Sequence, residues 1–162
     1  TPTLTINTFD SRRFYADPEW RKTYKDLPEA AEKDWMDGSI RLSANDVTEN
    51  ALKFDEWSLS LVRTMHEEGV KIIAGTDTPI GYLTPGYSLH KELELLAEAG
   101  LSNLEVLKSA TITPAEFFGL EDKMGTIEAG MLADLVILNQ NPLESISNTQ
   151  DIHLVIAKGY IQ

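Results

Sequence analysis

The sequence predicts an α/β fold in which helices surround a short parallel strand and a small β unit follows. The run of residues 70–74 is short, β-branched and mostly apolar, which is typical of a parallel strand covered on both faces. A long helical pattern precedes this run, and helical patterns fill most of 88–119. After Leu120, glycines and asparagines separate short apolar pieces. This order indicates a βαβ unit with a β appendage.

The N-terminal portion predicts a strand followed by a long insertion. Residues 1–6 lack Met and begin directly with a strand-like pattern, so we expect the chain to be part of a longer polypeptide. Segment 8–45 is polar and aromatic, with helix starts at Asp17, which precedes Pro18, and at Pro28. Because long connections in compact domains often serve as lids or binding loops, 8–45 is predicted to be a lid-like insertion.

Two longer helices flank the predicted strand. The first begins near Ser43 or Asn45 and runs to Glu68, where Gly69 provides its stop. The second covers about 88–99 and carries leucines on one face. Both helices therefore offer an apolar face that can cover the strand.

Two capping boxes predict two further helix starts. Ser102 is followed three residues later by Glu105, and Thr113 by Glu116, with Pro114 expected at the first helical position. In a capping box, the hydroxyl and the carboxylate satisfy backbone N–H groups that a helix start leaves unpaired.

The apolar pieces after residue 120 predict a small β unit. The expected strands are 126–127, 135–138 and 153–156. The change of pattern places a boundary between residues 119 and 120.

Charge and composition exclude several classes of partner. The net charge is -12, from 26 acidic and 14 basic residues, and the basic residues are scattered singly, so no nucleic-acid or anionic membrane surface is expected to bind. No apolar run is long enough to predict a membrane span. With no cysteine, any metal must be held by histidine, carboxylate or water.

Asp77 is the leading candidate for chemistry. It lies at the carboxyl end of the predicted strand, where parallel α/β folds place their ligands and catalytic groups. Gly75 allows another group to approach the backbone closely, and Thr78 and Pro79 turn the chain away. A carboxylate at this position can bind a divalent metal and accept a proton from metal-bound water. The alternative is that Asp77 only caps the turn that follows.

The three histidines give a weaker signal. A zinc site needs three or four ligands, and His66, His90 and His153 show no HxH or HExxH spacing. His90 follows the Asp77 loop and could contact substrate, although a hydrogen bond at the helix start is the alternative. His66 is expected at the surface, and His153 in a strand without a chemical role.

Other catalytic arrangements are absent from the sequence. There is no GxSxG elbow, no phosphate-binding glycine loop and no cysteine nucleophile. Trp20, Trp35 and Trp57 are more typical of packing than of recognition, although aromatic side chains in a long loop could line a pocket.

Several motifs together resemble the C-terminal part of the amidohydrolase superfamily, in particular its imidazolonepropionase-like and Xaa-Pro or Xaa-Arg dipeptidase-like members. The motifs, in chain order, are VKIIAGTDTP (70–79), PGYSLHKEL (85–93), AGL (99–101), AT (110–111), TPA (113–115), GTI (125–127) and AGMLADLVIL (129–138). The resemblance is strong over 70–162, weaker over 1–7, and absent across 8–45.

The resemblance implies a fold and a metal site. The chain would be the C-terminal fragment of a (β/α)8 TIM-like barrel, with its last two strands and helices in 1–119, plus strands of the accompanying small β-sandwich in 120–162. Residues 1–7 would form strand seven. The family holds one or two divalent metals, usually zinc, through an HxH pair, a carboxylated lysine or a glutamate, two further histidines and a strand-eight aspartate. Asp77 matches that aspartate, a metal ligand and proton shuttle, and Asp134 is expected to be structural.

The implied activity belongs to a longer enzyme. The full-length protein is expected to hydrolyse carbon–nitrogen bonds in small amide or dipeptide substrates, whereas this chain, which lacks the HxH pair, the lysine and the other histidines, is expected to be inactive. The alternatives are a cyclic amide hydrolase or deaminase of the same superfamily and a non-catalytic, barrel-derived interaction module. Exposed strand edges of a partial barrel also predict a homo-oligomer. The sequence gives no indication of cellular location.

Overall fold

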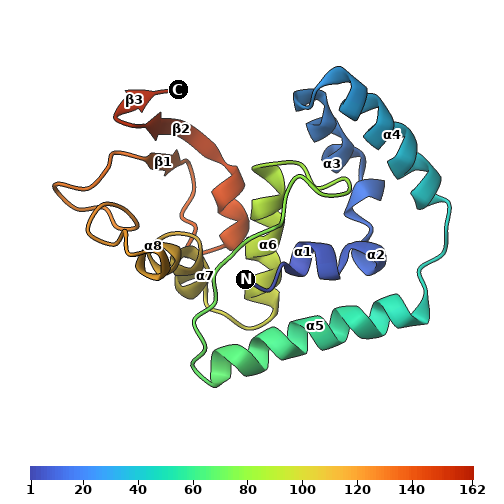
Figure 1. Cartoon of the computed structure of the whole chain (residues 1–162), viewed down its shortest axis with the longest axis horizontal. Coiled ribbons are helices and arrows are strands. Elements are labelled where there is room, and N and C mark those ends of the chain that lie inside the picture. Colours follow the sequence, from blue (N-terminus) through green and yellow to red (C-terminus); the bar gives the residue numbers. More distant parts are fainter.

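The computed structural model describes residues 1–162 (Figure 1). Its α-helices are α1 (Leu4–Asn7), α2 (Phe9–Arg12), α3 (Pro18–Lys22), α4 (Glu29–Ser43), α5 (Glu49–Glu67), α6 (Tyr87–Glu98), α7 (Asn103–Ser109) and α8 (Ile112–Phe118). The 3-10 helices are η1 (Phe14–Ala16), η2 (Thr23–Asp26) and η3 (Ile146–Gln150). The strands are β1 (Leu135–Leu138), β2 (Ile152–Ala157) and β3 (Tyr160–Ile161).

Helix α6 forms the centre of the fold. It packs against α1 and α5 from the N-terminal part and against α7 and η3 from the C-terminal part. Figure 1 shows α1 to α4 gathered on one side of α6 and the strands on the other, with α5 along one edge. Leu93, Leu95 and Leu96 of α6 are buried, and Leu4 of α1 and Val62 of α5 join them in one core.

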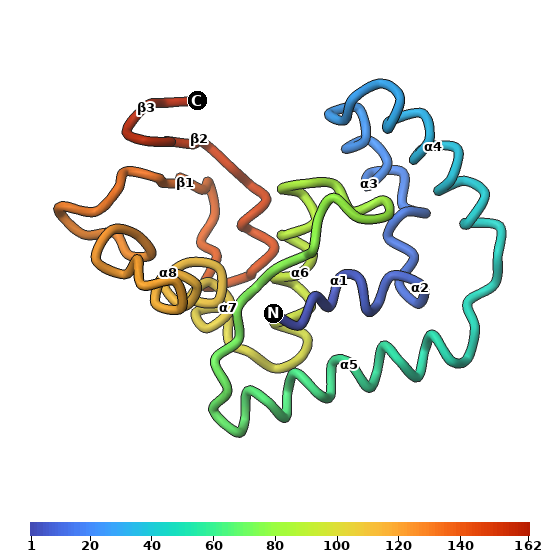
Figure 2. Tube along the Cα trace, viewed as in Figure 1, coloured from blue at the N-terminus to red at the C-terminus, as the bar shows by residue number.

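The predicted parallel strand at 70–74 is not formed. The segment runs without helical turns between α5 and α6 (Figure 2), and no strand pairs with it. Ala74 makes one backbone hydrogen bond, donating its N–H to the carbonyl of Ser109 at 2.9 Å. Because a strand requires a neighbouring strand edge, the apolar, β-branched composition of 70–74 is not enough to form one here.

The predicted strand at 1–7 is also wrong, because residues 4–7 form α1. Thr3 has a φ of 51°, which turns the chain into the helix. The first N–H groups of a helix lack intrahelical partners. Those of Leu4 and Thr5 donate to the Glu92 carboxylate of α6 at 3.0 and 2.7 Å. A carboxylate from another helix thus caps α1, and this capping favours helix over strand.

The helix predictions are confirmed with small shifts. Asp17 accepts a hydrogen bond from the Glu19 N–H at 2.9 Å and caps α3. The helix expected from Ser43 or Asn45 begins instead at Glu49, since α4 extends to Ser43 and Thr48 caps α5 through the N–H of Ala51. Helix α6 starts one residue earlier than expected, at Tyr87.

One capping box is confirmed and the other is wrong. Ser102 and Glu105 make the reciprocal hydrogen bonds of a capping box at the start of α7. Helix α8 begins at Ile112, with Thr111 before it and no side-chain cap. Thr113 and Pro114 therefore lie inside the first turn, where proline is tolerated because no intrahelical hydrogen bond is lost there.

The C-terminal β unit is an antiparallel sheet in the order β1-β2-β3. Leu135 pairs with Ile156, and the register shifts between Ile137 and Leu138. Two of the expected strands are confirmed, residues 126–127 are not a strand, and β3 was not predicted. The expected βαβ unit is not formed, because neither 1–7 nor 70–74 is a strand. The division at residue 120 stays a prediction.

Segment 8–45 is a set of short helices that packs onto the loop after Asp77. Tyr82 of this loop lies against Phe9 and Trp35, with ring centroids 6.0 and 5.8 Å away. Gly38, in the middle of α4, faces the same ring, and a Cβ atom there would lie 2.2 Å from the Tyr82 hydroxyl oxygen. No helix is long and apolar enough to cross a membrane.

Candidate active site

Asp77 lies at the end of the extended segment that follows α5. Its side chain is exposed, and its φ of 58° is a left-handed conformation that Asp adopts more readily than most residues. The neighbouring Thr76 is buried, and its hydroxyl donates to the hydroxyl of Thr78 at 3.3 Å. A non-glycine residue held in this conformation at a chain turn is a common feature of functional sites.

Gly75 allows a close approach beside Asp77, as its position in the sequence suggested. A Cβ atom at residue 75 would lie 2.4 Å from the Cγ2 atom of Thr1. The start of the chain therefore lies against the segment that carries Asp77. Neither segment is a strand, and the barrel placement implied by the resemblance stays a prediction.

The residues of this chain do not by themselves form a metal site. No group of three or more histidine, cysteine, aspartate or glutamate side chains is placed to hold a metal ion. Zinc requires three or four protein ligands for tight binding, and Asp77 supplies one carboxylate. Neither His66 nor His153 lies near it in a ligand cluster, so a metal at Asp77 requires ligands from outside the 162 residues.

The loop that leads from Asp77 to α6 is fixed by segment 8–45. The indole Nε1 of Trp20 donates to the carbonyl of Tyr82 at 2.8 Å. The hydroxyls of Thr23 and Thr84 are 2.6 Å apart and share a hydrogen bond. The predicted insertion therefore contacts the loop at Tyr82 and Thr84, and its role as a lid stays a prediction.

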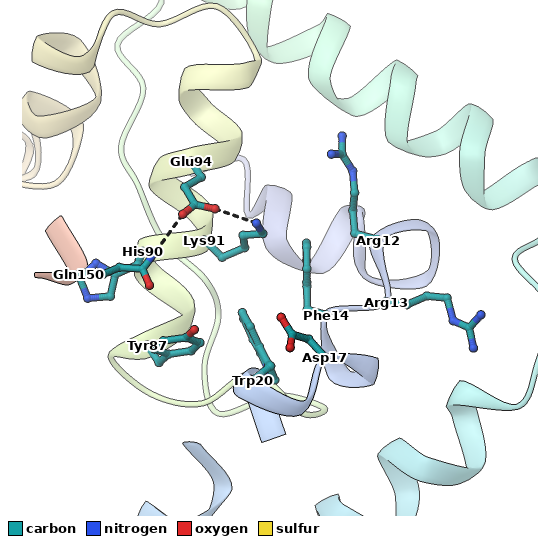
Figure 3. A pocket seen from close by; sticks show the side chains of 10 residues that line it. All are labelled: Arg12, Arg13, Phe14, Asp17, Trp20, Tyr87, His90, Lys91, Glu94 and Gln150. Carbon is teal, nitrogen blue, oxygen red and sulfur yellow. Dashed lines mark hydrogen bonds and ion pairs between the residues drawn. The ribbon is translucent and has the colours of Figure 1, made fainter. Parts of the chain in front are cut away.

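His90, in the first turn of α6, lines a cavity of about 360 Å³ that lies between α6, the first helices and η3 (Figure 3). Burial lowers the pKa of His90, against the opposing effect of Glu94. Its Nδ1 lies 3.0 Å from the Thr149 hydroxyl oxygen, and that hydroxyl donates to the Ile146 carbonyl at 2.8 Å. In the tautomer that carries its proton on Nδ1, His90 donates to the Thr149 hydroxyl and Nε2 is an acceptor.

The other two histidines lie apart from this cavity. His66 Nε2 is 3.5 Å from a carboxylate oxygen of Glu105, at the start of α7. His153 is exposed on β2. The absence of a role for either residue stays a prediction, as does the role of His90 in binding substrate.

Trp20 packs in the core, as the sequence indicated, and its indole also binds the loop after Asp77 and lines the His90 cavity. The role of Glu92 was missed from the sequence. Glu92 is fully buried and binds the start of α1. For Glu92, the available signal was a carboxylate on the leucine face of an amphipathic helix, a position where an unpaired charge is costly.

The fold and the motif positions agree with a known class of enzymes. Residues 40–161 match the amidohydrolase family pattern. The chain therefore belongs to the amidohydrolase family.

Three relatives illustrate the likeness. The chain is 43% identical over 60 residues to an imidazolonepropionase of Thermoplasma acidophilum, covering 35% of this chain and 15% of that protein. It is 37% identical over 76 residues to a 5'-deoxyadenosine deaminase of Methanobrevibacter smithii, covering 45% and 18%. It is also similar to the crystal structure of a Xaa-Pro dipeptidase with methionine bound in its active site, with a TM-score of 0.62 and 33% identity, covering 72% and 28%. The chain thus spans less than a third of the length of each.

Proposed function

We propose that this chain is a portion of a metal-dependent hydrolase that cleaves carbon–nitrogen bonds in small amide- or dipeptide-like substrates. The supporting observation is the family match over 40–161, which includes Asp77 at the end of its extended segment. The similarity to a Xaa-Pro dipeptidase favours a peptide-like bond. The proposal includes a TIM-type barrel that residues outside this chain complete. The similarity to solved amidohydrolase structures supports this part.

In this proposal Asp77 is both a metal ligand and the proton-carrying carboxylate. A divalent ion, proposed to be zinc, would supply Lewis-acid chemistry once further ligands are provided from elsewhere. The reaction adds water to the carbonyl carbon and breaks the C–N bond. The proton taken from the water passes through the Asp77 carboxylate to the leaving nitrogen. Asp77 is exposed and lies at a turn, so its carboxylate is accessible to a substrate that residues outside this chain help to bind.

A second candidate is the hydrolysis of a cyclic amide or the deamination of a ring. It is supported by the similarity to an imidazolonepropionase and a 5'-deoxyadenosine deaminase over parts of the chain. Asp77 would carry the proton in the same way, and only the substrate would differ.

Two measurements test the proposal. The isolated 162-residue chain, assayed with zinc against dipeptides, N-acyl amino acids and cyclic amides, should show no turnover, because it lacks a ligand cluster. Turnover by the chain alone would contradict this part of the proposal.

In the longest natural polypeptide that contains this sequence, Asp77→Asn should lower kcat by a factor of about 100 or more. The matched control is Asp122→Asn, which removes an exposed carboxylate far along the chain and should leave kcat unchanged. If Asp77→Asn were fully active, Asp77 would have no catalytic role. If the wild-type polypeptide hydrolysed none of the substrates, the chain would act as a non-catalytic interaction module.

A further inference from the structure

The cavity that His90 lines carries three aromatic rings, two carboxylates and three basic side chains. Trp20 stacks on Phe14 with a centroid distance of 5.4 Å, and Tyr87 meets Trp20 edge-on at 5.1 Å. The three rings come from η1, α3 and α6, so elements distant in the sequence build one wall. Aromatic faces carry negative charge density and attract organic cations.

The basic residues around the cavity are occupied elsewhere. Figure 3 shows Arg12 and Arg13 extending away from the aromatic rings. Arg12 binds Asp55 at 2.6 Å and Glu98 at 2.7 Å. Arg13 donates to backbone carbonyls at the end of α4. These two side chains therefore have few donors left for a ligand inside the cavity.

Lys91 shows that the cavity already accommodates a cation. Its Nζ lies 5.3 Å from the centroid of the Phe14 ring and 2.7 Å from a carboxylate oxygen of Glu94. An ammonium group held between an aromatic face and a carboxylate is the arrangement expected for amine recognition. The protein's own side chain occupies one such position.

The groups left open in the cavity are acceptors. Asp17 uses one oxygen to cap α3, and its other oxygen has no hydrogen-bond partner. The Nε2 atom of His90 also has no hydrogen-bond partner, and it is an acceptor in the tautomer that carries the proton on Nδ1. The pKa of Tyr87 is raised, first by burial and then by Asp17 and Glu94, which agrees with a negative potential at this wall.

We propose that this cavity binds an organic ammonium group attached to an apolar body, such as a small primary amine. The ammonium would donate to Asp17, and the apolar part would lie on Trp20 and Tyr87. Asp77 does not line the cavity, so this proposal does not depend on the proposed hydrolysis.

The test uses the 162-residue chain and three probes of similar shape, 2-phenylethylammonium, 2-phenylethanol and 3-phenylpropionate. Binding is followed by NMR through the indole N–H signals of the three tryptophans. The ammonium probe should shift the Trp20 signal and leave the signal of Trp57 on α5 unchanged. It should bind about tenfold more tightly than the alcohol. Equal binding of the alcohol, tighter binding of the carboxylate, or no shift at Trp20 would overturn the proposal.

Two variants sharpen the test. Asp17→Asn keeps the helix cap because asparagine caps as well as aspartate does, but it removes the charge, and it should weaken ammonium binding about tenfold. Asp10→Asn, an exposed carboxylate outside this cavity, is the matched control and should change nothing. Lys91→Met frees the Phe14 face and one oxygen of Glu94, and it should bind the ammonium probe more tightly than the wild type. Weaker binding by Lys91→Met would contradict the proposal.

An Asp77→Asn chain should bind all three probes as the wild type does. This separates the two proposals, because failure of the hydrolase assay would leave the amine-binding result intact and the reverse also holds. If Asp77→Asn weakened ammonium binding, the cavity would not be the site occupied.

Discussion

The turn that carries Asp77 and the cavity that contains His90 differ in how they are built. Asp77 is exposed, and the motif around it is recognisable in the sequence, but this chain surrounds it with no ligand cluster. Only the α6 residues of the cavity lie in a motif, and its side chains from five elements are held by ring stacking, ion pairs and hydrogen bonds. A candidate site can therefore be easy to recognise and incomplete, or assembled by packing and only partly visible as a motif.

The largest effect is expected from removing a side chain of the cavity wall, which tests whether the cavity belongs to the stable core. Trp20→Ala should lower the free energy of unfolding by about 3–5 kcal/mol, because a buried ring that stacks on Phe14 and donates to Tyr82 is lost. The measurement is urea denaturation of the 162-residue chain. Trp57→Ala is the control, since Trp57 is 55% exposed, and it should cost much less. Equal losses in the two variants would mean that the cavity wall is not part of the stable core.

A smaller effect is expected at Glu92, which fixes the start of the chain that lies beside Gly75. Its two oxygens accept hydrogen bonds from the N–H groups of Leu4 and Thr5 and from the Thr5 hydroxyl. Glu92→Gln replaces one acceptor oxygen with a donor, so a buried N–H loses its partner and the free energy of unfolding should fall by about 1–3 kcal/mol. The exposed Glu121→Gln is the matched control and should be neutral.

The stability difference between the wild type and Glu92→Gln should depend on pH with a defined sign. Burial raises the pKa of Glu92, and the hydrogen bonds from Thr5 and Leu4 only partly oppose this. A raised folded-state pKa gives stability that is present below the unfolded pKa and is lost as the pH rises through the folded pKa. The cost of Glu92→Gln should therefore be larger at about pH 4 than at about pH 8. A cost that grew with pH would show that Glu92 is not desolvated as described.

The smallest effect is expected at Asp77 itself. Its exposed side chain makes no hydrogen bond or ion pair within this chain, so Asp77→Asn should change the free energy of unfolding by less than about 0.5 kcal/mol. A loss above about 1 kcal/mol would favour the alternative in which Asp77 stabilises the turn.

Local signals in the sequence predicted the helices well and the strands poorly. Asp17, Ser102 and the leucine face of α6 act within a few residues, so their caps and helices are found where they were expected. A strand at 70–74 would need a neighbouring strand edge, and none is present. Residues 4–7 form a helix instead of a strand because their first N–H groups are capped by the Glu92 carboxylate, which is 87 residues from Thr5 in the sequence. The sequence carried no local signal for either outcome.

The candidate site was also predicted only where local sequence signals determine it. The position of Asp77 at a chain turn followed from the motif, and the contact beside Gly75 followed from the residue type. The cavity could not be predicted, because the Trp20 ring of α3 meets the Tyr87 ring of α6 only through tertiary packing. The resemblance seen in the sequence did not extend to 8–45, so it could not predict the contact of this segment with the Asp77 loop.

The contact between Gly38 and Tyr82 restricts which residues can be substituted at these two positions. Glycine inside a helix costs about 1 kcal/mol relative to alanine, so most helices would replace it over time. Here any side chain at position 38 would meet the Tyr82 hydroxyl. A larger residue at 38 should become acceptable only in descendants that carry a smaller ring or no ring at 82, so the two positions are expected to change together or not at all.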